Sequence, residues 1–111
     1  MRHAREIHRR ALSAMHGDLA RTWDVPSLAR ASATSRATLA RRFVASVGEP
    51  PLAYLTRARM HDAAQRLRSS DAGLGEIAAA VGYQSEFAFN RAFRRAFGTP
   101  PGAYRRAQRA R

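Results

Sequence analysis

The 111-residue sequence contains no cysteine, no lysine and only eight acidic residues. The absence of cysteine excludes disulfide bonds, thiolate zinc sites and cysteine nucleophiles, and the absence of lysine excludes a nucleotide-binding phosphate loop. No apolar run approaches the roughly 18 residues that a membrane span needs, because charged residues interrupt every such stretch. The first residues also lack the apolar centre of a signal peptide, so we expect a cytoplasmic protein with no membrane partner.

All twenty basic residues are arginine, which leaves a net charge of +12. So much charge of one sign on a chain about one domain long implies a polyanionic partner, which is a nucleic acid, an anionic membrane surface or an acidic protein. Apolar residues make up 45% of the chain. That fraction is enough for a small core, so we expect a folded domain rather than a disordered basic tail.

Apolar residues recur at helical spacing along the chain, and no segment alternates in the way of a strand. The pattern predicts an all-α fold of about seven helices, separated by capping residues, glycines and prolines. We expect helices at 4–16, after Asp24, from Ser35 to Gly48, at 51–70, between Gly73 and Gly82, from Ser85 to Gly98, and from Pro100 through Tyr104. The long helix carries an apolar stripe from Leu52 to Leu67. A basic tail follows the last helix.

Part of the sequence repeats at a spacing of fifty residues. Residues 35–54 laid over 85–104 give eight identities in twenty positions without a gap, at Ser35/Ser85, Arg41/Arg91, Phe43/Phe93, Gly48/Gly98, Pro50/Pro100, Pro51/Pro101, Ala53/Ala103 and Tyr54/Tyr104. Each copy reads as a short helix, a tight turn and a capped second helix, which is the helix-turn-helix arrangement. We therefore expect two such subdomains, 1–50 and 71–111, joined by a linker helix at 51–70.

The second helix of each copy turns one face away from the predicted core, and the first half of that face can reach base edges in a major groove. The candidate base-contacting residues are Arg36, Ala37, Ala40 and Arg41 in the first copy and Glu86, Phe87, Asn90 and Arg91 in the second. Arginine can donate two hydrogen bonds to guanine, asparagine pairs with adenine, and glutamate accepts from the cytosine amino group. Glu86 has a second interpretation, which is stabilisation of the positive helix N-terminus.

Phosphate contacts position a protein on DNA, and they need hydroxyl or guanidinium donors beside the reading face. The candidates are Ser35, Arg42, Ser85, Arg94, Arg95, Arg105 and Arg106. For these arginines the alternative is solvated surface charge, whereas for Arg41 and Arg91 the alternative to base contact is a phosphate contact or an intramolecular ion pair. Arg59, in the long helix, is more consistent with a structural role. The four histidines follow no metal-ligand spacing and no catalytic constellation is visible, so we expect neither a metal, nor a cofactor, nor an enzyme.

A set of residues spread over roughly 5–107 resembles the DNA-binding region of AraC/XylS-type transcription regulators. The set comprises Leu28-Ala29, Ser35, Leu39, Arg41, Phe43, Gly48, Pro50-Pro51, Tyr54, Arg59-Met60, Ile77-Ala78, Val81-Gly82-Tyr83, Ser85, Phe89, Arg91, Phe93, Phe97-Gly98, Pro101 and Tyr104. The resemblance implies sequence-specific binding of double-stranded DNA, regulation of transcription, most often activation, and contact with RNA polymerase. Most members of the family also carry a sensory domain, which is not visible in this sequence. The chain is therefore either the C-terminal piece of a longer protein or similar to the short members without a sensor, and residues 3–23, which resemble the lead-in of members with an N-terminal sensory domain, favour the fragment.

The sequence departs from the family pattern at Ala33, where the first turn usually has glycine. We expect that turn to be strained or to adopt different backbone angles. Two motifs in tandem predict an asymmetric or direct-repeat target, read from one face if the recognition helices lie about one DNA turn, roughly 34 Å, apart. The competing hypothesis is a non-specific basic protein that binds nucleic acid or an anionic membrane surface without sequence preference.

Overall fold

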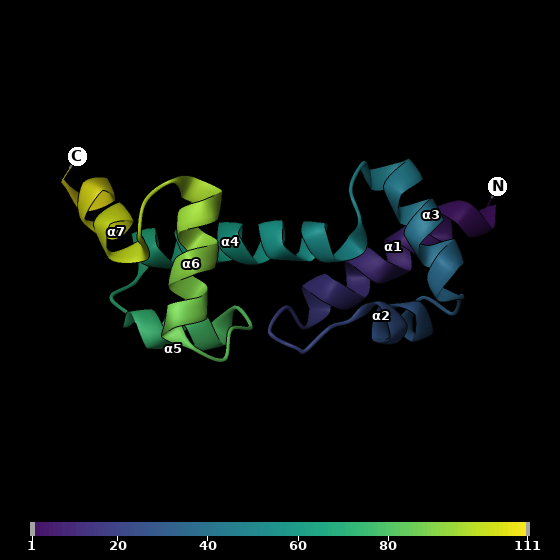
Figure 1. Cartoon of the computed structure of the whole chain (residues 1–111), viewed down its shortest axis with the longest axis horizontal. Helices are drawn as coiled ribbons and strands as arrows, with labels where there is room; N and C mark the ends of the chain where they lie inside the picture. The colour runs from purple at the N-terminus through teal and green to yellow at the C-terminus, as the bar shows by residue number, and fades with distance from the viewer. Residues whose placement is uncertain (1, 111) are drawn as a thin grey trace. The chain divides into compact units, whose positions relative to one another are not determined.

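The computed structural model describes residues 2–110, and within this range it contains seven helices and no strand. The helices are α1 (Arg2–Gly17), α2 (Val25–Ala31), α3 (Arg36–Val47), α4 (Pro51–Ser69), α5 (Leu74–Ala80), α6 (Glu86–Phe97) and α7 (Pro101–Arg109) (Figure 1). The all-α prediction is confirmed. None of these helices is both long enough and apolar enough to cross a membrane.

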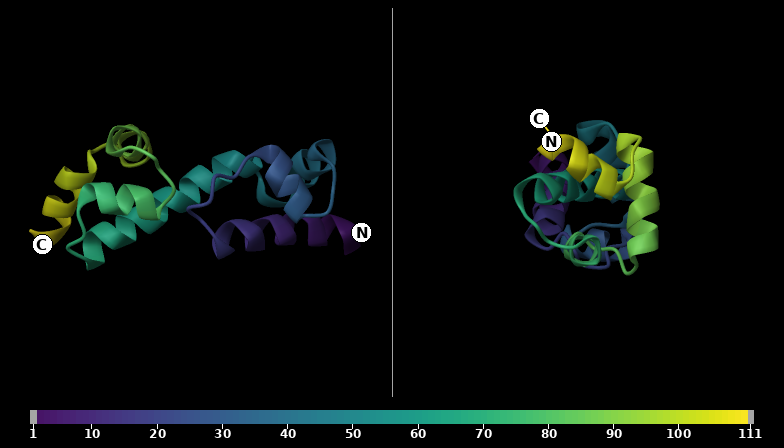
Figure 2. Two further views of the ribbon diagram at one scale, coloured as in Figure 1. Left: turned by 90° about the horizontal axis from the view of Figure 1, so that it is seen from below. Right: turned by 90° about the vertical axis from the view of Figure 1, so that its left-hand side faces the viewer.

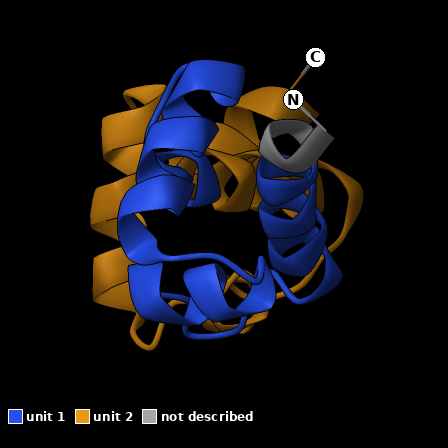
Figure 3. Ribbon diagram, turned by 90° about the vertical axis from the view of Figure 1, so that its right-hand side faces the viewer, with its two compact units in different colours: residues 1–56 blue, residues 57–111 orange. Residues whose placement is uncertain are grey.

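The chain forms two compact units, residues 1–56 and 57–111, and the boundary falls inside α4 (Figure 3). Each unit has its own apolar core. The first unit contains the α2–turn–α3 motif and the second contains the α5–turn–α6 motif, so the two copies of the sequence repeat belong to different units.

In the first unit, α1 packs against α2 and α3 (Figure 2). Ala11 and Met15 of α1 are fully buried with Leu28, Leu39 and Phe43, and Leu55 from the start of α4 completes this core. Trp23 covers one end of the core with only 8% of its surface exposed. Its indole Nε1 donates to the carbonyl of Asp18 at 2.9 Å.

In the second unit, the C-terminal part of α4 packs with α5 and α6 around a cluster of aromatic rings. Phe89 and Phe93 are fully buried, and the ring of Phe93 lies 4.6 Å from that of Phe97 and 5.3 Å from that of Tyr104, measured between centroids. Aromatic pairs at such distances add stabilisation beyond the area they bury. The predicted inward faces of α3 and α6 therefore form the two cores, with Val47 and Phe97 only partly buried.

Local capping chemistry starts α2, α3 and α6 and ends α3 and α6 where the sequence predicted. Asp24 caps α2 in a capping box, because its Oδ1 accepts from the Ser27 amide at 2.8 Å and Ser27 Oγ accepts from the Asp24 amide at 3.0 Å. Hydrogen bonding from Ser27 to the carboxylate, from its backbone amide first and from its hydroxyl second, lowers the pKa of Asp24 below its ordinary value. Gly48 and Gly98 end α3 and α6 at φ values of 92° and 77°, in the left-handed region that favours glycine.

Two expectations need correction. Leu52 was predicted on the buried stripe of α4 but is 38% exposed, because the stripe begins instead with Pro51 and Leu55. The last helix was predicted to end near Tyr104 and give way to a basic tail, but α7 continues to Arg109. Arg109 holds this extension, since its guanidinium donates to the Ser70 carbonyl at 2.6 Å and pairs with Asp71 at 2.7 Å.

Candidate nucleic-acid interface

The turn between the two helices of each motif has the same hydrogen bonds in both units. In the first, Ala33 N–H donates to the carbonyl of Arg30 and Thr34 N–H donates to that of Ala29, at 3.1 and 3.0 Å. In the second, Gly82 and Tyr83 repeat the pattern with Ala79 and Ala78, at 3.1 and 2.8 Å. This Schellman arrangement satisfies carbonyls at the end of the first helix and redirects the chain into the second.

Such a turn needs a left-handed residue, and Ala33 and Gly82 occupy that position with φ values of 56° and 97°. Ala33 is the one non-glycine residue with positive φ among residues 2–110. The first motif therefore keeps the turn geometry and accepts the strain of a Cβ atom, as the sequence analysis anticipated.

The exposed face of α3 is short and basic. Ser35 caps the helix, its Oγ accepting from the Thr38 amide at 3.2 Å. The candidates Arg36, Ala37, Ala40 and Arg41 are all exposed. Val44, one turn further along, is 44% exposed. The face therefore offers guanidinium donors between methyl-sized groups, which suits contact with guanine and with thymine methyls.

The exposed face of α6 carries larger and chemically more varied groups. Ser85 caps the helix, its Oγ accepting from the Ala88 amide at 3.0 Å. Glu86, Phe87 and Arg91 are exposed, and Asn90 is half-buried. The Cζ atom of Arg91 lies 5.8 Å from the centroid of the Phe87 ring, within cation–π range.

Glu86 stands in the first turn of α6, and its Oε1 reaches over Gly75 of α5. A carboxylate in that turn stabilises the helix dipole. The first interpretation of Glu86, contact with a cytosine amino group, stays a prediction.

Most of the candidate phosphate contacts surround these faces with their side chains in solvent. Ser35, Arg42, Ser85, Arg94, Arg95 and Arg106 are all exposed. Arg105 differs, because it is half-buried and its Nε and Nη2 donate to the carbonyls of Leu67 and Ser70, each at 3.2 Å. Arg105 thus holds α7 against the end of α4, and we no longer include it among the phosphate contacts.

Arg30 also lies at this surface, although the sequence pattern did not predict it. A depression beside the N-terminus of α3 is lined by residues from the end of α2, the turn and the start of α3, namely Pro26, Ala29, Arg30, Thr34, Ser35 and Arg36. Two exposed guanidinium groups border it. The position of Arg30 in the last turn of the first motif helix, next to the cap of the second, is the signal that could have identified it.

Arg59 of α4 lies against the turn of the second motif. Atoms of its guanidinium group stand 2.9 Å from the point where a Cβ atom on Gly82 would be, so glycine is needed there for space as well as for φ. Burial lowers the pKa of Arg59 and raises that of Tyr83, and each group partly offsets the shift of the other. The arrangement agrees with the structural role expected for Arg59.

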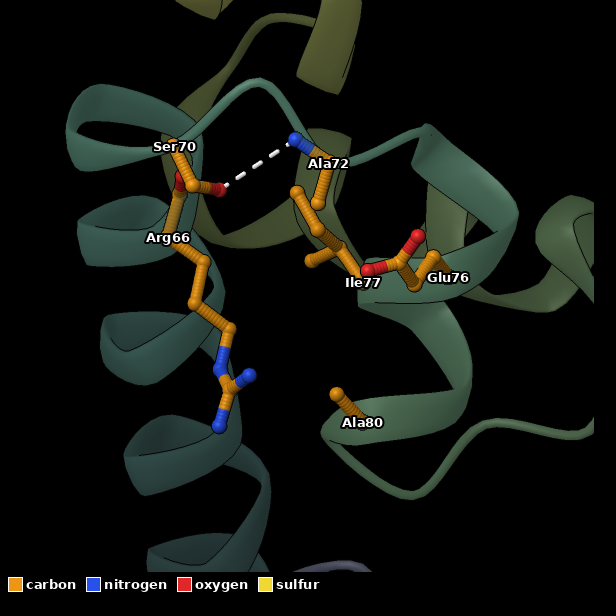
Figure 4. Close-up of a pocket in the computed structure, with 6 residues that line it drawn as sticks. All are labelled: Arg66, Ser70, Ala72, Glu76, Ile77 and Ala80. Atoms are coloured by element: carbon orange, nitrogen blue, oxygen red, sulfur yellow. Dashed lines mark hydrogen bonds between the residues drawn. The ribbon is translucent and has the colours of Figure 1, made fainter.

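A second depression lies between α4 and α5 of the second unit, lined by Arg66, Ser70, Ala72, Glu76, Ile77 and Ala80 (Figure 4). Its volume is about 40 Å³. Arg66 is bonded to Asp62 at 3.1 Å, and Ser70 Oγ accepts from the Ala72 amide at 3.4 Å.

The sequence is similar to a protein-family model and to several curated proteins. A family model described as a helix-turn-helix domain matches residues 28–107. An AraC-like transcription regulator of Streptomyces lividans is 53% identical over 96 residues, which cover 86% of this chain and 32% of that protein. The transcriptional regulator AlkR of Acinetobacter baylyi is 43% identical over 95 residues, covering 86% and 31%. The chain therefore spans about a third of the length of these curated relatives.

Among solved structures, the crystal structure of the DNA-binding domain of AdpA, a global transcriptional factor in complex with a target DNA, is similar with a TM-score of 0.90. The two chains are 34% identical, and the match covers 95% of each. The similarity extends over both helix-turn-helix motifs, since it leaves out only about a twentieth of the chain.

Proposed function

The chain belongs to the AraC-type family of helix-turn-helix transcription regulators, and from this premise we propose that it binds double-stranded DNA at specific sequences and so regulates transcription. One observation carries the proposal. Both motifs expose an arginine at the same place on the second helix, Arg41 in α3 and Arg91 in α6. In a major groove an arginine at this place can donate two hydrogen bonds to guanine O6 and N7.

Affinity in this proposal comes mainly from phosphate contacts, and specificity comes from the exposed faces of α3 and α6. The net charge of +12 and the exposed guanidinium groups beside each face supply the phosphate contacts. The specificity comes from the side chains that point outward from the first half of each recognition helix, where such helices reach base edges. In this proposal each unit contributes one recognition helix, α3 from the first and α6 from the second, and α4 is the linker.

The finer parts of the proposal follow the family. Activation through contact with RNA polymerase is the mode we propose, with the bacterial chromosome in the cytoplasm as the place of action. Regulators of this kind act where their operator lies near a promoter, so promoter DNA is the expected target.

Selection of bound duplexes from a random pool by the full chain, followed by sequencing, tests the proposal. We expect one enriched motif with two unlike halves, because α3 and α6 expose different side chains. Competition against a scrambled duplex at fixed salt then measures the preference, and ratios of about 10³ or more are typical of specific binding. Equal binding of both duplexes with a steep salt dependence would instead identify a non-specific basic protein.

A further inference from the structure

The exposed face of α6 carries a feature that α3 lacks, an aromatic ring beside an arginine. Phe87 is 71% exposed, more than Val44 or Leu52, the other large apolar side chains that are exposed in residues 6–110. A ring in this position contributes nothing to the core of the second unit. Its apolar surface is therefore available for a contact that removes it from water.

Phe87 and Arg91 stand four residues apart and so lie one above the other on the same helix face. The guanidinium carbon lies 5.8 Å from the ring centroid. Contact with the ring restricts the conformations of the long arginine side chain before any ligand arrives. Less conformational entropy is then lost when the guanidinium group binds.

From this geometry we propose that Phe87 and Arg91 form one reading unit, which recognises a thymine next to a guanine on adjacent base pairs. The inference rests on the proposed function and adds a specific base step to it. Thymine presents a C5-methyl group that an apolar ring can contact, and guanine presents O6 and N7 to the guanidinium group. The separation of 5.8 Å is between one and two base-pair steps of about 3.4 Å.

Other bases fit this pair less well. Cytosine lacks the methyl group, and adenine presents an amino donor where the guanidinium group needs an acceptor. The equivalent position in α3 is Ala37, whose methyl group cannot lie over Arg41 as a ring lies beside Arg91. The step is therefore read by the second motif alone, and it appears in one half of the target.

Uracil in place of the thymine tests the inference, because it removes only the methyl group. The full chain is titrated against the selected duplex with thymine or uracil at that position, and binding is followed by fluorescence anisotropy. We expect about fourfold weaker binding to uracil, the effect of one buried group of methyl size. In the Phe87→Ala variant we expect the two duplexes to bind equally. Leu52→Ala, which removes another exposed apolar side chain, serves as the control and keeps the difference.

The guanine is tested in the same way with 7-deazaguanine, which lacks the N7 acceptor. Wild type should lose affinity for this duplex, and Arg91→Ala should not distinguish it from the unmodified one. A selected motif without the thymine–guanine step, or an equal response to uracil in wild type and Phe87→Ala, overturns the inference and leaves the proposed function intact. A selection that enriches no motif overturns the proposed function itself.

Discussion

The turns of the two motifs give an opposite pair of stability predictions. Ala33 and Gly82 occupy the same left-handed position, but only one has a Cβ atom. In that region a Cβ atom costs about 1–2 kcal/mol. Glycine instead costs about 0.4–1 kcal/mol, because the unfolded chain gains freedom. The Ala33→Gly variant should therefore raise the free energy of unfolding of the first unit by about 0.5–1 kcal/mol.

Gly82→Ala should lower the free energy of unfolding of the second unit, because it adds the same strain at a φ of 97°. It also forces the half-buried guanidinium group of Arg59 to move, since the new Cβ would lie 2.9 Å from its atoms. We expect a loss of about 1 kcal/mol from strain, with the displacement of Arg59 added to it. Gly98→Ala is the matched control, because Gly98 has a φ of 77° in the same unit and nothing within 4 Å of the new atom.

Urea denaturation separates the two effects. The single tryptophan, Trp23, is buried in the first unit, so its fluorescence reports the unfolding of that unit in Ala33→Gly. Circular dichroism of the whole chain reports the loss of helix in Gly82→Ala and in Gly98→Ala. A lower midpoint for Ala33→Gly would refute the strain argument. Equal losses in Gly82→Ala and Gly98→Ala would refute the contact with Arg59.

Three further predictions concern DNA binding, acid stability and the cores. Arg91→Ala should weaken binding to the selected duplex by about 1–3 kcal/mol and relax the preference at one base pair, whereas Arg106→Ala should weaken binding to specific and scrambled duplexes alike. Filter binding to both duplexes distinguishes the two variants. The pKa of Asp24 is lower in the folded than in the unfolded chain, so the first unit should lose stability as the pH falls from about 3.9, the ordinary pKa of aspartate, to the pKa of the folded state. Asp24→Asn should remove that part of the pH dependence, which Trp23 fluorescence measures. Phe43→Ala and Phe93→Ala should each cost about 3–5 kcal/mol, but only Phe43→Ala should abolish the native Trp23 emission, since each ring belongs to one core.

Local chemistry explains why much of the fold could be predicted. A serine that accepts from the amide three residues on, as Ser35 and Ser85 do, starts a helix whatever surrounds it. Glycines with positive φ end helices for an equally local reason. The arginines of the reading faces, Arg41 and Arg91, were placed outward because the apolar stripe of each helix leaves one face for solvent.

Contacts between distant residues account for what the sequence did not reveal. The continuation of α7 depends on Arg105 and Arg109, which bond to carbonyls 35–39 residues earlier in the chain. Leu52 has the spacing of a core residue, but the buried stripe of α4 passes through Pro51 and Leu55 and leaves Leu52 exposed. The approach of Arg91 to the Phe87 ring depends on side-chain rotamers, which residue spacing does not specify.

The repeat separates residues that position a recognition helix from residues that read DNA. Of its eight identities, most lie in caps, cores and helix starts, such as Ser35/Ser85, Gly48/Gly98 and Phe43/Phe93. On the reading faces only the pair Arg41/Arg91 is shared, and the other positions differ in size and charge. The two motifs thus position their second helices with the same kinds of residues but expose different side chains, so a duplex with two identical halves would match only one of the two exposed faces. We therefore expect an asymmetric target from the chemistry of the two faces, however the two units are arranged.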